Sequence, residues 1–317
     1  MDRSFALDLA RVTEAAALAC GRWVGRGDKI SADDAATTAM RQTLSTLQID
    51  GTVVIGEGEM DEAPMLYIGE KVGSEGQLKV DIAVDPLEGT NLCSKGGPGA
   101  IATIAMAPGG GFLHAPDMYM DKIIVGPAGH GCIDINDRPS ANLKRLAKSK
   151  KCQLEDLTVV LLDRPRHDEA VEDIRQCGAR IKLISDGDVA PAVATGMIDS
   201  GIDMVLGVGG APEGVLAAAA VKCFGGNMQG RLIFTTDEER IRAPKMGITD
   251  LDKVYTAEEM AQGDVFFAAT GVTSGDLLKG VRYFAGGAET HTIVMRSKSR
   301  TIRLLETLHY FDHKPKH

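Results

Sequence analysis

The sequence predicts an α/β protein with an α+β N-terminal half and a second half in which strands alternate with helices. Two observations carry this prediction. After two initial helices the first half consists mainly of strands, which is typical of helices packed on one sheet. In the second half a strand, a polar loop and a helix follow one another three times, which predicts a parallel sheet with right-handed crossovers. We expect the domain boundary in the basic helical segment at residues 140–151, giving domains of residues 1–145 and 146–317.

The composition is that of an ordinary globular protein of 317 residues, long enough for two domains with sizeable cores. The net charge of −9 argues against binding to nucleic acid or to anionic membranes, because no basic tail or patch stands out. The six cysteines are widely spaced without a C-x-x-C pair, as in reduced, cytoplasmic proteins. Neither a signal peptide nor an apolar run of about 18 residues is evident, so we expect a soluble, cytoplasmic protein.

Two amphipathic helices are predicted at the start of the chain. Residues 4–24 carry apolar side chains at helical spacing, and this pattern ends at the glycines of residues 25–29. The second helix is predicted to begin at Ser31, because Ser31 and Asp34 match a capping box. Asp33 in its first turn has two explanations: it stabilises the helix dipole, or it is a metal ligand that needs other carboxylates nearby.

The next two strands both lead into acidic turns. Residues 52–55 form an apolar strand followed by Glu57, which has a glycine on each side and could approach a cation without crowding. Residues 79–84 form a second strand with alternating β-branched side chains. We expect Pro86 to end the hydrogen-bond ladder of this strand, because proline has no backbone donor.

The stretch Asp85-Pro-Leu-Glu-Gly-Thr90 holds two carboxylates and a hydroxyl at the end of the second strand. Asp85 and Glu88 are hard oxygen ligands of the kind that Mg²⁺ requires, and Gly89 allows a sharp turn. Beside a bound cation, the Thr90 hydroxyl could position or activate water for attack on a phosphate. An ordinary polar turn after a strand is the alternative, and the stretch by itself does not decide between them.

The remaining predicted elements flank the repeated unit. We expect strands at residues 100–107 and 122–125, with the Tyr119 hydroxyl at the end of the loop between them. After the repeat, a strand at residues 264–269 leads to a short helix that carries Lys279. The C-terminal strand and the basic segment beside it are expected at the surface or at an interface.

The first two loops of the repeat hold groups suited to a phosphorylated sugar. Arg164 and Arg166 could hold a phosphate through their guanidinium forks, and Asp186 and Asp188 could accept sugar hydroxyls. In open parallel sheets, ligands bind at the carboxyl ends of the strands, where these loops lie. Exposed arginines before a helix and an Asp186 N-cap are the alternatives, but polar loops at consecutive strand ends favour a binding site.

The third loop, Gly207-Val-Gly-Gly-Ala-Pro-Glu213, offers backbone N–H groups at the start of a helix, which is an anion site. Glu213 is either a ligand or a first-turn acid that acts on the helix dipole. The loop nearly matches the dinucleotide fingerprint but lacks its last glycine. No G-x-x-x-x-G-K-[ST] is present in the sequence, so P-loop nucleotide chemistry is unsupported.

These motifs resemble a known family. Asp85-Pro-Leu-Glu-Gly-Thr90 resembles the D-P-[IL]-[DE]-G-[ST] signature of the lithium-sensitive, metal-dependent sugar phosphatase superfamily. Other segments resemble its class II, bacterial-type fructose-1,6-bisphosphatase branch and follow in order along almost the whole chain: Gly56-Glu-Gly-Glu, Ala63-Pro-Met-Leu-Tyr-Ile-Gly-Glu-Lys, Ala115-Pro-Asp-Met-Tyr-Met, Arg-Pro-Arg-His, Ile-Ser-Asp-Gly-Asp-Val and Gly-Gly-Ala-Pro-Glu-Gly. The resemblance implies a layered α/β/α/β/α sandwich and a gluconeogenic metal-dependent phosphatase. The enzyme would hydrolyse the 1-phosphate of fructose 1,6-bisphosphate.

The resemblance also implies roles for individual residues. The implied metal ligands are Asp33, Glu57, Asp85, the Leu87 carbonyl, Glu88 and Glu213. The implied catalytic residues are Thr90, which would polarise the attacking water, with Asp33, Asp61 and Lys29 near the metals. The implied substrate contacts are Glu88, Gly89, Thr90, Tyr119, Arg164, Pro165, Arg166, Asp186, Gly187, Asp188 and Gly210. Because every implied ligand is an oxygen donor, Mg²⁺ or Mn²⁺ is favoured over zinc. The resemblance further implies a homo-oligomer, a tetramer or a dimer.

Three other functions are open. A dual fructose/sedoheptulose bisphosphatase and an enzyme like inositol monophosphatase belong to the same class. The loop with Arg164 and Arg166 favours a bisphosphate, because a non-reacting phosphate needs an anchor remote from the metals. A non-catalytic sugar-phosphate-binding regulator is a different class. The presence of all five acidic ligand positions together with Thr90 argues against it.

Overall fold

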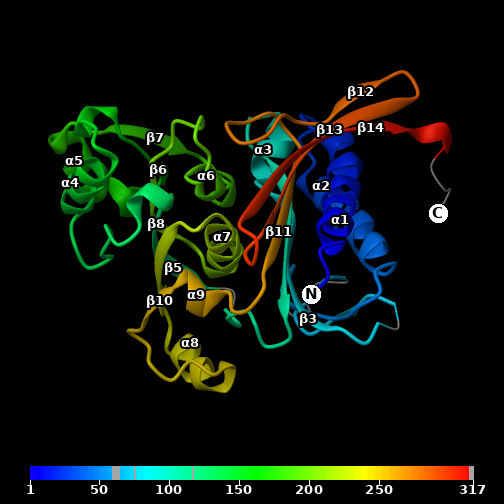
Figure 1. Ribbon diagram of the computed structural model, residues 1–317, viewed down its shortest axis with the longest axis horizontal. Coiled ribbons are helices and arrows are strands. Elements are labelled where there is room, and N and C mark those ends of the chain that lie inside the picture. The colour runs from blue at the N-terminus through cyan, green and yellow to red at the C-terminus, as the bar shows by residue number, and fades with distance from the viewer. Residues whose placement is uncertain (59–64, 75, 116–117, 314–317) are drawn as a thin grey trace. The chain divides into compact units, whose positions relative to one another are not determined.

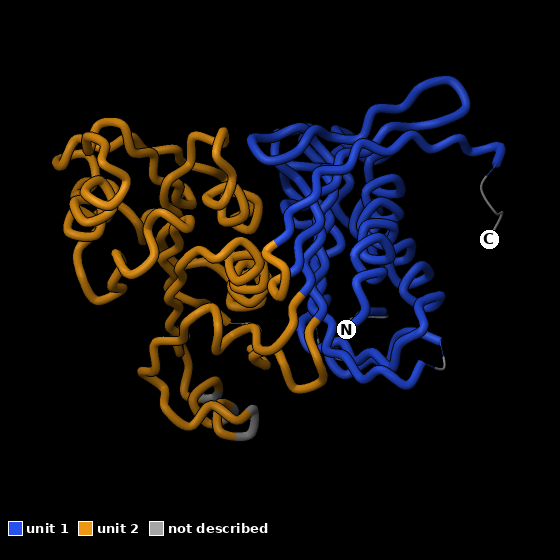
Figure 2. The backbone as a smooth tube through the Cα atoms, viewed as in Figure 1, with its two compact units in different colours: residues 1–106, 266–296, 301–317 blue, residues 107–265, 297–300 orange. Residues whose placement is uncertain are grey.

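The computed structural model describes residues 1–58, 65–74, 76–115 and 118–313, apart from the side chains of residues 238, 242, 245 and 246 (Figure 1). The chain divides into two compact units (Figure 2). Unit 1 comprises residues 1–106, 266–296 and 301–317, and unit 2 comprises residues 107–265 and 297–300. The predicted boundary between residues 145 and 146 falls inside α4 (Pro139–Lys150), within unit 2.

Unit 1 is built on an eight-stranded mixed sheet in the order β12-β13-β11-β4-β3-β1-β2, with β14 paired to β13. Its strands are β1 (Asp50–Ile55), β2 (Lys71–Val72), β3 (Lys79–Glu88), β4 (Ile101–Pro108), β11 (Phe266–Gly271), β12 (Arg282–Phe284), β13 (Gly287–Arg296) and β14 (Thr301–Tyr310). β1 and β3 are parallel, whereas β11 is antiparallel to both β4 and β13. The sheet therefore joins the N-terminal and C-terminal parts of the chain.

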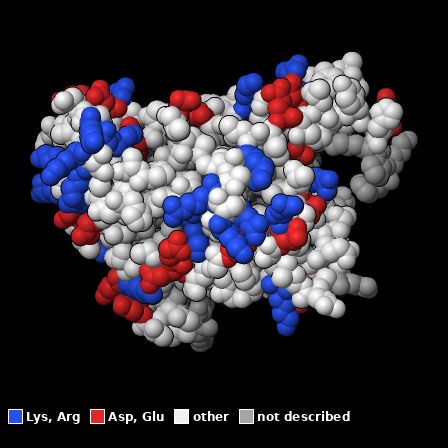
Figure 3. Space-filling view, in the orientation of Figure 1, with Lys and Arg blue, Asp and Glu red and all other residues white. Residues whose placement is uncertain are grey.

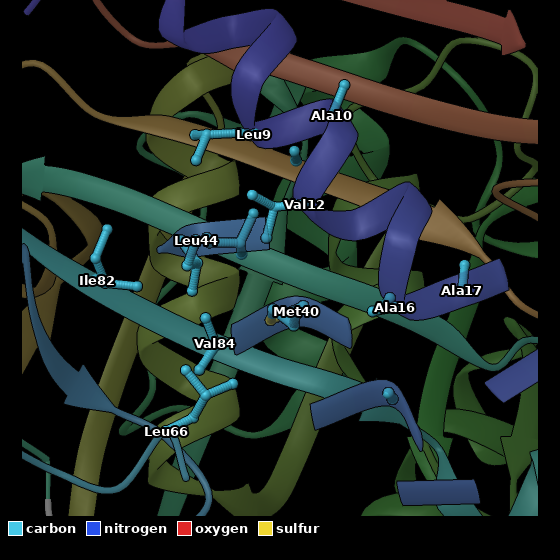
Figure 4. Packing of buried hydrophobic residues seen from close by; sticks show 14 of the residues in the cluster. Leu9, Ala10, Val12, Ala16, Ala17, Met40, Leu44, Leu66, Ile82 and Val84 are labelled. Atoms are coloured by element: carbon cyan, nitrogen blue, oxygen red, sulfur yellow. The ribbon is translucent and has the colours of Figure 1, made fainter. Parts of the chain in front are cut away.

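Helices α1 (Phe5–Cys20) and α2 (Lys29–Leu44) pack on one another and on this sheet. Figure 4 shows Leu9 of α1 and Met40 and Leu44 of α2 in the same apolar cluster as Ile82 of β3. All four side chains are fully buried. Burial of one such side chain contributes about 1.5–3 kcal/mol, so this packing fixes α2 against the strand that carries Asp85.

Two predictions about this unit are corrected at element ends. The N-cap of α2 is Asp28 and not Ser31, because the Asp28 carboxylate accepts from the Ser31 N–H at 3.0 Å and from the Ser31 hydroxyl at 2.7 Å. β3 continues past Pro86 to Glu88. β1 ends at Ile55, which pairs with Ala83, so the missing donor of Pro86 removes no bond to β1.

The predicted helix around Lys279 is also wrong. Residues 272–281, all of which the structure describes, contain no helix. The Gly275 N–H donates to the Leu278 carbonyl at 2.9 Å, and the Val281 N–H donates to the Val272 carbonyl at 3.3 Å. These bonds close a turn in which the backbone groups are paired without a helix.

Unit 2 holds a six-stranded mixed sheet in the order β10-β9-β5-β8-β6-β7. Its strands are β5 (Tyr119–Val125), β6 (Thr158–Leu162), β7 (Arg180–Ile184), β8 (Met204–Gly210), β9 (Asn227–Ile233) and β10 (Val254–Thr256). β7, β6 and β8 are parallel, as the repeated pattern predicts. β5 is antiparallel to β8 and β9, so the sheet is not wholly parallel. The mixed α/β fold class is confirmed.

The helices of unit 2 are α4, α5 (Asp168–Cys177), α6 (Val189–Ala194), α7 (Ala211–Phe224), α8 (Asp237–Arg242) and α9 (Ala257–Met260). The glycine-rich segment before α7 differs from the prediction. β8 runs through Gly210 and α7 begins at the next residue, so this segment is the end of a strand and not a loop. Its pairing with β5 accounts for the difference, since Gly210 lies opposite Tyr119 and Gly207 opposite Lys122.

The surface carries both signs of charge. In Figure 3 acidic and basic side chains are interspersed over the face that is drawn, and basic side chains gather over α4 at its left edge. α4 carries Lys144, Arg145, Lys148 and Lys150. Among the described residues, no helix is both long and apolar enough to cross a bilayer.

Candidate functional site

The turn from β3 into α3 (Thr90–Lys95) fixes one group of predicted ligands. Gly89 has φ of 84°, the left-handed conformation that favours glycine, and α3 begins at the next residue. The Leu87 N–H donates to Asp85 Oδ1 at 3.1 Å, and the Thr90 hydroxyl donates to the Leu87 carbonyl at 3.1 Å. One carboxylate oxygen of Asp85 lies within 4.8 Å of one of Glu88. This rigid turn therefore presents two carboxylates and a hydroxyl together.

Asp33 of α2 and Glu57, which lies two residues after the end of β1, form a second acidic pair. Burial raises the pKa of Asp33. A hydrogen bond with Glu57 lowers this pKa, and the nearby charge of Asp34 raises it. Half-buried carboxylates repel one another unless a proton or a cation lies between them, so the pair has the chemistry of a hard divalent-cation site.

Lys29 and Asp61 are the two other catalytic residues that were predicted to lie near the metals. Lys29 is the first residue of α2 and is exposed. Asp61 lies outside the described residues.

In unit 2, the predicted phosphate-binding arginines are held by backbone carbonyl groups. Arg164 donates to the carbonyls of Asp163 and Ser185, both at 2.8 Å. Arg166 donates to the Val208 carbonyl from Nε at 3.1 Å and from Nη2 at 2.7 Å. Its guanidinium carbon lies 5.2 Å from the centre of the Tyr119 ring, which is a cation–π contact. The structure therefore brings Tyr119 and Arg166 together.

Asp188 forms a buried ion pair that the sequence analysis missed. Its carboxylate lies 2.7 Å from Nζ of Lys122, and the two side chains are 11% and 2% exposed. Lys122 also donates to the Gly210 carbonyl at 3.0 Å, so it joins two predicted substrate residues. The signal was present in the sequence as a lysine inside an apolar strand, because a buried lysine requires a partner.

The glycines at the end of β8 leave space for these polar side chains. A Cβ at Gly209 would collide with the Asp188 carboxylate, and a Cβ at Gly210 would collide with the Glu213 carboxylate. Gly210 has φ of −65°, which any residue adopts, so glycine is required there for space. Glu213 in the first turn of α7 therefore lies over Gly210. Asp186 is half-buried in the segment between β7 and α6, next to Gly187 with φ of 76°.

Comparison with known proteins connects these features to a family. A family described as bacterial fructose-1,6-bisphosphatase, glpX-encoded, matches residues 3–309. The D-fructose 1,6-bisphosphatase class 2/sedoheptulose 1,7-bisphosphatase of Synechococcus sp. (strain JA-2-3B'a(2-13)) is 46% identical over 337 residues, covering 98% of this chain and 97% of the relative. The protein of the same name from Synechococcus elongatus (strain ATCC 33912 / PCC 7942 / FACHB-805) is also 46% identical over 337 residues, covering 98% of each chain.

A weaker similarity is to a solved structure, the inositol monophosphatase from Anabaena (Nostoc) sp. PCC 7120. Its TM-score is 0.32 at 15% sequence identity, covering 62% of this chain and 73% of that chain.

Proposed function

This chain belongs to the bacterial fructose-1,6-bisphosphatase family, and we propose that it hydrolyses the 1-phosphate of fructose 1,6-bisphosphate to fructose 6-phosphate and phosphate. The match over residues 3–309 is the observation that carries the proposal. It spans the β3–α3 turn and the ends of β6, β7 and β8, and it confirms the resemblance inferred from the motifs. The reaction is a step of gluconeogenesis.

We propose that Mg²⁺ or Mn²⁺ is held by the carboxylates of Asp33, Glu57, Asp85, Glu88 and Glu213 and by the Leu87 carbonyl. The all-oxygen donor set, the placement of Asp33 beside Glu57 and that of Asp85 beside Glu88 support this assignment. When bound, the cations would supply positive charge that offsets the carboxylate repulsion and stabilises the leaving oxygen. The participation of Glu213 from unit 2 stays a prediction.

We propose that Thr90 orients the attacking water. Its hydroxyl proton is donated to the Leu87 carbonyl, so the oxygen lone pairs can accept from a water O–H. The bond also fixes the rotamer of Thr90 relative to Asp85 and Glu88. No Ser, Cys or His nucleophile is required, so water attacks phosphorus directly in this proposal.

The arginine loop would hold the phosphate that does not react. Arg164 and Arg166 are fixed by carbonyl groups at the ends of β7 and β8, and Tyr119 lies against Arg166. We assign Asp186, Gly187, Asp188 and the Gly210 backbone to the sugar hydroxyls, with Pro165 and Gly89 shaping the two turns. A fixed cationic anchor favours a bisphosphate substrate over inositol monophosphate.

The deciding test is phosphate release with Mg²⁺ or Mn²⁺ from fructose 1,6-bisphosphate, sedoheptulose 1,7-bisphosphate and inositol monophosphate in parallel. We expect turnover of fructose 1,6-bisphosphate that a chelator abolishes. Thr90→Ala should lower kcat by about 100-fold or more without changing the thermal midpoint. A fully active variant would remove Thr90 from the mechanism. A trapped phosphoenzyme, or phosphate without oxygen from isotope-labelled water, would exclude direct attack.

A second candidate is a dual fructose/sedoheptulose bisphosphatase, because the relatives that are 46% identical carry both names. Comparable turnover of the two bisphosphates would establish it. Binding of sugar phosphate with no phosphate release under any metal condition would instead indicate a regulator. We further propose a cytoplasmic homo-oligomer, a tetramer or a dimer, which light scattering coupled to size exclusion would test.

A further inference from the structure

We propose that His167 is a positioning residue that fixes Arg166 and the end of β8 for the phosphate of the substrate. The identity of that ligand rests on the proposed function. His167 is not among the predicted site residues, yet it follows Arg166 directly and is only 4% exposed.

The end of β8 needs support on the side that faces β6. Along its opposite edge β8 pairs with β5 over its full length, from Met204 to Gly210. The described pairing with β6 covers Met204 and Val205, and β6 ends at Leu162. The backbone groups of Val208 lie beyond this ladder. They must find other partners, because an unpaired buried backbone group is costly.

Two consecutive side chains supply those partners. The Val208 N–H donates to Nε2 of His167 at 2.8 Å, and the Val208 carbonyl accepts from both Nε and Nη2 of Arg166. The other ring nitrogen of His167, Nδ1, lies 2.7 Å from the Leu162 carbonyl. His167 therefore bridges the last residue of β6 to β8 at the point where the two strands separate.

The two backbone partners define the protonation state of the imidazole. A backbone N–H can only donate, so Nε2 must carry a lone pair. A carbonyl can only accept, so Nδ1 must carry the proton. His167 is thus a neutral imidazole with one donor and one acceptor, and both are used.

Gly207 provides the space for this ring. It has φ of 122°, and a Cβ at this position would lie 2.7 Å from Nε2 of His167. The strand therefore has glycine where the imidazole must approach its backbone. The same contact fixes Val208, and through its carbonyl it fixes the plane of the Arg166 guanidinium. Arg166 in turn lies against Tyr119, so the position of a phosphate anchor depends on His167.

The test is the dissociation constant for fructose 6-phosphate, measured by calorimetry. His167→Asn keeps a donor near the Nδ1 position but has no acceptor at the Nε2 position, whereas His167→Gln can place an oxygen near Nε2. We expect the Asn variant to bind about tenfold more weakly and the Gln variant to stay within roughly threefold of the wild type. In an Arg166→Gln background, His167→Asn should have no further effect, because the anchor is already lost.

His309→Asn is the matched control. His309 is a buried histidine of unit 1, 7% exposed, and it is hydrogen-bonded to the Thr290 hydroxyl at 2.8 Å. Its replacement can lower the thermal midpoint but should leave the fructose 6-phosphate affinity unchanged. In turnover of fructose 1,6-bisphosphate, His167→Asn should raise KM more than it lowers kcat.

Several outcomes overturn the proposal. The first is an unchanged fructose 6-phosphate affinity in folded His167→Asn, and the second is an equally large loss of affinity in His309→Asn. The third is a full further loss of affinity when His167→Asn is added to Arg166→Gln, and the fourth is that the wild type does not bind fructose 6-phosphate. If His167→Asn does not fold, Gly207→Ala displaces the ring by its Cβ and should give the same loss; an unchanged affinity would again overturn it. Wild type that binds fructose 6-phosphate but releases no phosphate from the bisphosphate contradicts the proposed function alone.

Discussion

The two strand-to-helix junctions, β3–α3 in unit 1 and β8–α7 in unit 2, use glycine for different physical reasons. At the first junction Gly89 adopts φ of 84°, so the backbone conformation requires glycine. At the second, Gly210 has an ordinary φ of −65°, and glycine is required because a Cβ would collide with the Glu213 carboxylate. The same residue type provides backbone freedom in one unit and space for a side chain in the other.

The two units also differ in how they hold buried charge. In unit 2 the Asp188 carboxylate faces the ammonium group of Lys122 at 2.7 Å. In unit 1 the carboxyl group of Asp33 is half-buried beside that of another acid, Glu57, and burial raises the pKa of Asp33. In unit 2 the charges of the two side chains cancel, whereas in unit 1 two carboxyl groups need a proton or a cation to offset their repulsion. Unit 1 should therefore respond to divalent metal, and the ion pair of unit 2 should not depend on it.

The largest expected effect on stability comes from breaking the buried ion pair. Lys122→Met leaves the Asp188 carboxylate without its cation in a site that is 11% exposed, which should cost about 3–5 kcal/mol of unfolding free energy. Denaturant unfolding measures the change. Asp188→Asn added to Lys122→Met should recover part of the loss, because the stranded charge is then absent.

Lys253→Met is the matched control, since Lys253 pairs with Glu259 at 3.0 Å and both side chains are exposed, at 40% and 43%. It should cost at most about 1 kcal/mol. Equal losses in the two lysine variants would show that burial does not distinguish these pairs.

A smaller effect is expected from metal on unit 1. At a free concentration of 100 times Kd, Mg²⁺ or Mn²⁺ should stabilise the folded protein by about 2.7 kcal/mol relative to chelator. Thermal unfolding with and without the metal measures this difference. Asp33→Asn should reduce it, because one proposed ligand loses its charge.

Asp34→Asn is the control for this change, because Asp34 is the exposed neighbour of Asp33 on the same helix. Asp34→Asn removes the same charge and should keep the full stabilisation by metal in thermal unfolding. If both variants lost the stabilisation by metal, the negative charge of this region, and not Asp33 as a ligand, would account for metal binding.

The smallest stability effect separates the two glycine roles. Gly89→Ala must adopt a left-handed conformation and should cost about 1–2 kcal/mol. Gly210→Ala keeps a favourable backbone but displaces the Glu213 carboxylate, so it should lower metal-dependent phosphate release more than it lowers the unfolding free energy. Parallel measurements of unfolding and activity test this contrast, and it would be refuted if both variants lost the two properties in the same proportion.

The sequence predicted local elements well and long-range pairing poorly. The three parallel strands β6, β7 and β8 followed from an alternating pattern that lies within one stretch of chain. The antiparallel neighbours β5 and β9 join that sheet from both sides of the stretch, and hydrophobic periodicity does not encode which strands pair. The end of β8 was predicted as a loop because glycine is a turn signal, whereas here it makes room for side chains.

The candidate site shows the same division. Asp85, Glu88 and Thr90 lie on one short turn, so sequence proximity alone was enough to group them. Lys122 and His167 were missed because their roles depend on contacts with residues distant in the chain. Lys122 meets Asp188 across the sheet, and His167 meets the Val208 backbone. The apolar strand around Lys122 indicates that this lysine needs a partner but does not identify Asp188, and the contact of His167 leaves no motif in the sequence.

The insertion of unit 2 between β4 and β11 has a consequence for biosynthesis. Met106 and Phe266 are register partners in the sheet of unit 1, although the chain of unit 2 separates them. On the ribosome, β4 emerges long before β11, so the sheet of unit 1 stays open at that edge while residues 107–265 are made. Most of unit 2 forms one continuous stretch and can fold during this interval, and the late C-terminal strands then complete unit 1.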